Sequence, residues 1–120
     1  MSDYLIVYEG GNQDASKRTP EQMRAIMEQW VTWYKELEAK GVLRSPGSRL
    51  APAGAVIRTN GKGFVTDTTM AEVKELIGGF SIIQADSLDQ AAKIAEGAPF
   101  LRNNPDGRIQ VRPVFEPPKA

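Results

Sequence analysis

Acidic side chains are the residues best suited to chemistry in this chain, and Asp67 stands out among them. The chain has no histidine and no cysteine. It therefore lacks the usual acid–base residue near neutral pH, the thiol nucleophile and the commonest metal ligands. Asp67 follows the strand-like run Phe64–Thr66. There it either caps the segment Thr68–Ile77 or anchors a polar site, and as a general base it would need partial burial to become basic enough.

Aromatic and charged residues elsewhere in the chain are candidates to complete a ligand pocket with Asp67. We expect this pocket in the cleft between a sheet and the long helix, because ligand pockets combine an apolar wall with a few polar groups. Each candidate also has a structural interpretation, as a core aromatic or as a solvated or locally paired charge. The sequence leaves open whether the pocket is catalytic or only binds a small molecule. The candidate ligand-binding residues are Trp30, Trp33, Tyr34, Arg58, Glu72, Lys74 and Arg112.

Metal, nucleotide and haem sites are not expected. Without histidine or cysteine, only an all-carboxylate site for Mg²⁺ or Ca²⁺ is conceivable, and no dense acidic loop has the required spacing. Gly10-Gly11 and Gly61-Lys62-Gly63 lack the complete phosphate-loop pattern. Haem would need non-histidine ligation, which is uncommon. We therefore predict no cofactor.

Length and charge predict a single domain over residues 1–120. Fifteen basic side chains balance fifteen acidic ones, whereas nucleic-acid binders usually carry a net positive field or a basic stripe. No apolar run approaches the ~18 residues of a membrane span, and the first residues lack the pattern of a signal peptide. We expect a cytoplasmic protein that binds neither nucleic acid nor membrane.

The clearest predicted element is a long amphipathic helix that begins after Thr19 and ends at Gly41. Thr19 is a good N-cap, Pro20 suits the first helical position, and Gln22 completes a capping box. A second capping box at Ser87-Leu88-Asp89-Gln90 predicts the start of a shorter helix. In the long helix, apolar residues recur at three- and four-residue steps, which predicts one face against a sheet: Met23, Ile26, Met27, Trp30, Trp33, Tyr34 and Leu37.

Runs rich in β-branched and aromatic residues mark the expected strands. They are Tyr4–Tyr8, Ala55–Thr59, Phe64–Thr66, Phe80–Ala85 and Ile109–Phe115. Asn60-Gly61 lies between the second and third runs and is a strong hairpin signal, because both residues tolerate positive φ. Pro113 cannot donate a hydrogen bond to a sheet, so it predicts an edge strand or a bulge.

Three further segments are expected to connect these elements. Val42–Pro52 contains two prolines and a glycine, which predicts a loop. Ala71–Ile77 is expected to form a short helix that Gly78-Gly79 ends. Ala98–Gly107 is expected to be a loop with a turn near its end.

The order of these elements predicts an α+β sandwich of the ferredoxin-like kind, with two main helices on one face of a mostly antiparallel sheet. The opposite face then has no helix to cover it. Because Tyr4–Tyr8 and Phe80–Ala85 are apolar on both sides, we expect a second subunit to cover that face. The predicted state is a homodimer.

Matches to a known family are spread over nearly the whole chain. They comprise Met23–Trp30, Trp33–Leu37, Gly41, Leu50, Pro52, Val65-Thr66-Asp67, Ala71-Glu72, Lys74-Glu75, Gly78-Gly79-Phe80 and Val111-Arg112-Pro113-Val114. In these residues the chain resembles the YCII-related proteins, and within them the subgroup named for an Asp-Gly-Pro-Phe motif. The resemblance implies a dimeric α/β barrel, a pocket near Asp67 and a homodimer.

The chain departs from the subgroup in the motif itself. Where the subgroup has Gly-Pro-Phe after the aspartate, this chain has Thr68-Thr69-Met70. Some YCII-like proteins are thought to use a histidine–aspartate pair, which a chain without histidine lacks. Proteins of the subgroup are often encoded beside, or fused to, alternative sigma factors. The resemblance therefore also implies an alternative role as a non-catalytic regulatory or interaction protein.

Overall fold

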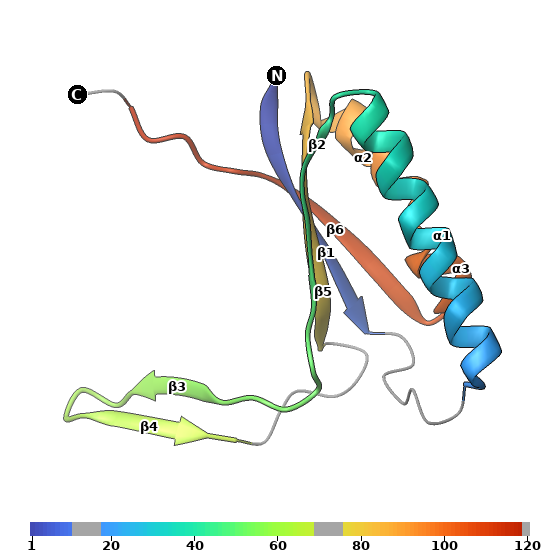
Figure 1. Cartoon of the computed structure of the whole chain (residues 1–120). Helices are drawn as coiled ribbons and strands as arrows, with labels where there is room; N and C mark the ends of the chain where they lie inside the picture. The colour runs from blue at the N-terminus through green and yellow to red at the C-terminus, as the bar shows by residue number, and fades with distance from the viewer. Residues whose placement is uncertain (11–17, 69–75, 119–120) are drawn as a thin grey trace.

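The described helices and strands follow the order that the sequence predicts, with one additional strand (Leu43–Arg49) and one additional short helix (Phe100–Asn103). The computed structural model describes residues 1–10, 18–68 and 76–118. In chain order the elements are β1 (Ser2–Gly10), α1 (Pro20–Ala39), β2 (Leu43–Arg49), β3 (Val56–Thr59), β4 (Phe64–Asp67), β5 (Ile77–Ala85), α2 (Leu88–Glu96), α3 (Phe100–Asn103) and β6 (Gly107–Pro113) (Figure 1).

Four of the strands form one antiparallel sheet in the order β2-β5-β1-β6. The helices lie together on one side of this sheet (Figure 1). β1 and β2 flank β5 and are joined through α1, which is the split β-α-β arrangement of ferredoxin-like folds. The predicted α+β architecture is therefore confirmed, as is a sheet face without a covering helix.

Local signals set the beginning of α1. The Gln22 backbone N–H donates to Thr19 Oγ1 at 3.1 Å, and the Gln22 side chain accepts from the Thr19 backbone N–H at 2.9 Å. The predicted capping box is therefore present. Trp33 and Leu37 are buried, but Met27, which the periodicity assigns to the same face, is 62% exposed. The apolar face of α1 is thus wider than the surface that the sheet covers.

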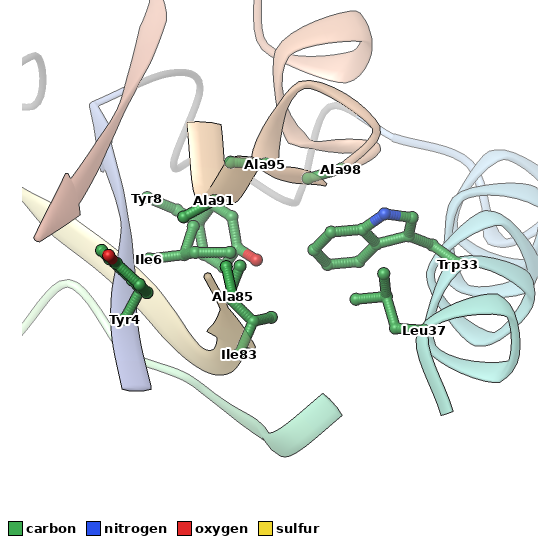
Figure 2. Packing of buried hydrophobic residues seen from close by; sticks show 10 residues of the cluster. All are labelled: Tyr4, Ile6, Tyr8, Trp33, Leu37, Ile83, Ala85, Ala91, Ala95 and Ala98. Carbon is green, nitrogen blue, oxygen red and sulfur yellow. The ribbon is translucent and has the colours of Figure 1, made fainter. Parts of the chain in front are cut away.

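The core lies between α1, α2 and the helix side of the sheet. Figure 2 shows Trp33 and Leu37 reaching from α1 toward the small side chains of Ala95 and Ala98 and the sheet residues behind them. At Gly97, an added Cβ would lie 3.1 Å from Trp33 Nε1. The small residues of this region therefore leave room for the indole ring.

The interpretation of Val42–Pro52 as a loop is wrong, because Leu43–Arg49 is strand β2 at the edge of the sheet. β2 pairs with β5 through two register irregularities, so Pro46 and Gly47 fit within an irregular strand. Gly47 has φ of +74°, and a Cβ there would lie 1.7 Å from the Phe80 carbonyl oxygen. Only glycine combines this backbone conformation with so close an approach.

The predicted helix end at Gly78-Gly79 is also wrong, because both residues belong to strand β5, which begins at Ile77. Gly79 lets β2 approach closely, since a Cβ there would lie 2.8 Å from the Ser48 carbonyl oxygen. The first part of the expected helix, residues 71–75, lies outside the described residues. The short helix α3 occupies part of the segment 98–107 that was expected to be a loop.

Strands β3 and β4 form the predicted hairpin, with Val56 opposite Asp67 and Thr59 opposite Phe64. Its turn is closed by the Asn60 backbone N–H, which donates to the Gly63 carbonyl oxygen at 3.2 Å. The prediction for Pro113 is confirmed too, because it ends β6 at the edge of the sheet. In the part of the chain that the structure describes, no helix is long and apolar enough to span a membrane.

Candidate functional site

The sheet face opposite the helices, here called the open face, has an apolar centre. On β1 the buried residues alternate with Leu5 and Val7, which are only partly buried. On β5, Phe80 and Ile82 alternate with buried residues in the same way, and the register pairs Leu5 with Ile82 and Val7 with Phe80. Directly opposite residues in a sheet share a face. Four large apolar side chains therefore meet on the open face.

Glu9 ends this apolar row and is nearly fully buried. Its Oε2 accepts from Arg108 Nη2 at 3.1 Å, and its Oε1 accepts from Gln110 Nε2 at 2.5 Å. Both donors come from β6, where Arg108 stands opposite Glu9 in the register. Hydrogen bonds to a charged acceptor are stronger than neutral ones, and losing a partner of a buried charge is costly. These three residues, the Glu9 cluster, therefore hold a carboxylate in a fixed position.

A second polar group lies at the other end of the open face. Asp3 Oδ1 is 3.5 Å from Arg44 Nε and accepts from Gln84 Nε2 at 3.4 Å. Arg44 belongs to β2 and Gln84 to β5, so Asp3 on β1 has partners on two other strands. Polar groups thus bound the apolar centre at both ends.

Three predicted pocket residues instead form an aromatic cluster on the helix side of the sheet. The Trp30 ring centroid lies 5.8 Å from that of Trp33 and 5.7 Å from that of Tyr34, and Trp30 meets Tyr8 edge to face at 5.1 Å. Tyr8 in turn lies 5.3 Å from Phe100. Such contacts add stability beyond the burial of area. This arrangement agrees with the interpretation of the aromatic stripe as core.

A hydrogen-bond chain connects two of these rings, Tyr8 and Tyr34, and is buried where Tyr8 meets Ser81. Ser81 Oγ is 2.9 Å from both the Tyr8 hydroxyl and the Pro46 carbonyl oxygen, and the Tyr34 hydroxyl donates to the same carbonyl at 3.2 Å. A carbonyl only accepts, so the Ser81 hydroxyl donates to Pro46 and the Tyr8 hydroxyl donates to Ser81. Burial raises the pKa of Tyr8 far above its usual range, and burial also raises the pKa of Tyr34.

The remaining predicted site residues lie in other parts of the chain. Asp67 is partly buried at the end of β4, and the register places Arg58 and Asp67 on one face of the hairpin. Arg112 is exposed on the open face, opposite Leu5. Figure 1 shows the hairpin projecting from the side of the sheet opposite α1. The structure therefore does not bring Asp67 together with the α1 aromatics in one chain, and Glu72 and Lys74 lie outside the described residues.

The hairpin and the Glu9 cluster lie at the same end of the sheet. β1 ends at Gly10, whose backbone N–H donates to the Leu76 carbonyl oxygen at 2.7 Å. In Figure 1 the end of β4, where Asp67 lies, is directed toward this end of the sheet. The hairpin that carries Asp67 therefore lies beyond the end of the sheet at which the Glu9 cluster stands. Among the described residues, no group of three or more acidic side chains is placed to hold a metal ion.

Comparison with known protein families identifies the chain. The sequence profile of the YCII-related domain matches residues 4–117. The chain belongs to the YCII-related family. A comparison with curated proteins found no match.

The sequence does not predict two features of this YCII-related protein, the Glu9 cluster and the hydrogen bond between Tyr8 and Ser81. Glu9 directly follows the expected strand Tyr4–Tyr8, and a charged residue in that position is only a weak signal of a site. Its partners Arg108 and Gln110 are 99 and 101 residues away in sequence, so no local pattern connects them. The hydrogen bond between Tyr8 and Ser81 likewise joins residues that are 73 positions apart in sequence.

Proposed function

We propose that this YCII-related protein is a homodimer that binds a small molecule at the open face of the sheet, near Asp67 and the Glu9 cluster. The observation that carries the proposal is the composition of this face, which combines large apolar side chains with hydrogen-bonded carboxylates at its margin. Ligand pockets have this combination of an apolar wall and a few oriented polar groups. Two such faces packed together form the dimeric α/β barrel that the family resemblance implies.

The ligand that fits these residues has an apolar or aromatic body and a polar head. Leu5, Val7, Phe80 and Ile82 offer an apolar surface, and Arg58 and Arg112 offer cationic groups for a carboxylate. If the protein is an enzyme, Asp67 is the candidate general base. The proposal concerns binding and holds whether or not a reaction follows.

A thermal-shift screen of small aromatic and carboxylic compounds tests the binding site. A ligand at ~100 times its dissociation constant adds about 2.7 kcal/mol of stability, which is a shift of several degrees for a domain of this size. We expect a shift for the wild type that Asp67→Asn strongly reduces. Asp106→Asn is the matched control, because Asp106 is an exposed aspartate in a turn where asparagine is equally suited. A shift of equal size in all three proteins would place the ligand elsewhere.

A second candidate function is that of a regulatory protein that binds an alternative sigma factor. The observation in its favour is an apolar stripe on α1, where Met23, Met27 and Val31 line a groove away from the open face and Met27 is 62% exposed. Exposed apolar surface of this kind is typical of interaction sites. In that case no compound in the screen shifts the melting temperature. A purified sigma factor of the extracytoplasmic-function type then binds the wild type more tightly than Met27→Asp.

A further inference from the structure

The chain is more extended than its length requires. Its radius of gyration is 16.6 Å, whereas a compact chain of this length has about 14 Å. Figure 1 shows the reason: the β3–β4 hairpin and the C-terminal tail after β6 both project from the sheet on the side away from the helices. Two separate segments therefore extend past the open face in the same general direction.

The hairpin carries apolar residues that the described part of its own chain leaves exposed. Phe64 is 84% exposed and Ile57 is 65% exposed, and the register places both on one face of the hairpin. Val56 and Val65 on the other face are also exposed. An isolated two-stranded hairpin is marginally stable in water, and soluble proteins rarely leave large apolar side chains together in solvent. The hairpin therefore has the properties of a segment that packs against another molecule.

The described chain is bonded to the sheet both before and after the hairpin. On the way out, the Leu50 backbone N–H donates to the Gly78 carbonyl oxygen at 2.9 Å. On the way back, the Leu76 carbonyl oxygen accepts from the Gly10 backbone N–H at 2.7 Å. Its turn is internally bonded, since Thr59 Oγ1 donates to the Gly63 carbonyl oxygen at 3.1 Å. The two bonds at Leu50 and Leu76 fix the points where the chain leaves and rejoins the sheet, both at its Glu9 end.

We propose that the β3–β4 hairpin is a dimerisation arm that packs against a second copy of this chain, so that each subunit's binding site includes residues of its partner. This inference rests on the proposed homodimer. A two-fold dimer formed through the open faces places the second copy where the hairpin projects, and symmetry makes the contact twice. The arm also places Arg58 and Asp67 at the boundary between the subunits. The binding site near Asp67 is then incomplete in one chain.

Substitution of Phe64 tests the arm. Because Phe64 is 84% exposed in the single chain, Phe64→Asp leaves the subunit folded, which circular dichroism checks. Burial of a phenylalanine side chain contributes about tenfold or more to an equilibrium constant. Since a two-fold dimer buries it twice, we expect dimer dissociation in analytical ultracentrifugation to become about a hundredfold easier. Met27→Asp replaces a similarly exposed apolar residue on the helix side and is the control that leaves the dimer unchanged.

A third variant separates failure of this inference from failure of the proposed homodimer. Val7→Asp places a charge in the centre of the open face and is expected to abolish the dimer. If Val7→Asp abolishes the dimer while Phe64→Asp leaves its dissociation constant unchanged, the homodimer stands and the arm is refuted. If the wild type is a monomer at micromolar concentration, both are refuted.

Mixed dimers show directly where the arm lies. The wild type has no cysteine, so Lys62→Cys carries a single spin label at the tip of the hairpin. This variant is mixed with ¹⁵N-labelled protein that carries no spin label. The spin label should then broaden amide signals of the ¹⁵N subunit, because the tip lies against the partner. If the amide signals of the ¹⁵N subunit stay sharp in a protein that is still dimeric, the arm is contradicted and the hairpin serves a different partner.

Discussion

Replacement of Ser81 by alanine is expected to destabilise the protein because it leaves the buried Tyr8 hydroxyl without its hydrogen-bond acceptor. Ser81 is completely buried, and its hydroxyl joins Tyr8 to the Pro46 carbonyl oxygen through two contacts of 2.9 Å. In Ser81→Ala, Pro46 keeps the hydrogen bond from Tyr34, at 3.2 Å. The buried Tyr8 hydroxyl, however, loses the acceptor of its proton.

The size of the destabilisation follows from this difference between Pro46, which keeps a partner, and Tyr8, which loses one. A buried polar group left without a partner costs about 1–3 kcal/mol, whereas the net contribution of an ordinary hydrogen bond is about 0.5–1.5 kcal/mol. We therefore expect Ser81→Ala to cost about 1–3 kcal/mol. Tyr8→Phe should cost less, because Ser81 still donates to Pro46. Once Ser81 is alanine, Tyr8→Phe removes the unpaired hydroxyl, so the double variant should be more stable than the sum of the single effects by about 1 kcal/mol.

Urea denaturation of the four proteins in this double-mutant cycle measures these differences. The fluorescence of Trp30 and Trp33 reports unfolding, because both tryptophans lie in the aromatic cluster. Protein concentration must be held constant, because the apparent stability of the proposed dimer depends on it. Ser48→Ala, at an exposed serine of the neighbouring strand, is the control and should change stability by less than about 0.5 kcal/mol. Strictly additive single effects would refute the assigned donor and acceptor roles.

Two further perturbations give distinct expected results. Gly61 has φ of +87° and no atom within 4 Å of an added Cβ, so Gly61→Ala should cost only the ~1–2 kcal/mol of the left-handed conformation. Gly47→Ala should cost several times more, because its Cβ would overlap the Phe80 carbonyl. Equal urea midpoints for the two variants would contradict the close approach of Gly47 to Phe80. Stability should be constant to about pH 9 and fall above about pH 10, because the unfolded chain ionises Tyr8 at its ordinary pKa while burial keeps the folded pKa raised. Tyr8→Phe should make this decline less steep by up to about 1.4 kcal/mol per pH unit, and an unchanged slope would show that Tyr8 is not protected by burial.

Elements that depend on neighbouring residues were predictable from the sequence. The capping box of α1 joins Thr19 and Gln22, three positions apart, and the hairpin turn joins Asn60 and Gly63. Each signal is complete within one short segment, so propensity and structure agree there. The confirmed parts of the fold, including the uncovered sheet face, rest on such local patterns in the right order.

Strand β2 was missed because the reason for its conformation lies in a different strand. Pro46-Gly47 is a turn signal by composition, but Gly47 serves the close approach to Phe80 on β5. Gly79 has the same role from the opposite side, toward Ser48. Glycine pairs are therefore ambiguous in sequence, because a helix end and a tight strand contact favour the same residue.

The wide apolar face of α1 explains why Met27 is exposed although the periodicity predicts that it faces the sheet. Periodicity groups Met27 with Trp30 and Trp33, but a helix can bury only the part of its circumference that contacts another element. Gln29, on the opposite flank, accepts from Asn103 Nδ2 at 2.9 Å, which fixes that flank of α1 against α3. The Met27 flank is then left away from both the sheet and α3.

The two carboxylates of the candidate site are suited to different tasks. Both oxygens of Glu9 accept hydrogen bonds, from Arg108 and from Gln110, and the residue is nearly fully buried. A group held in this way is well placed to fix the geometry of a binding surface, since its position is determined by two donors on a neighbouring strand. Asp67 is more accessible and lies on the hairpin that we propose to contact the partner. If the site performs a reaction, we propose that Asp67 transfers the proton, and that the proposed dimer determines whether Asp67 reaches the ligand.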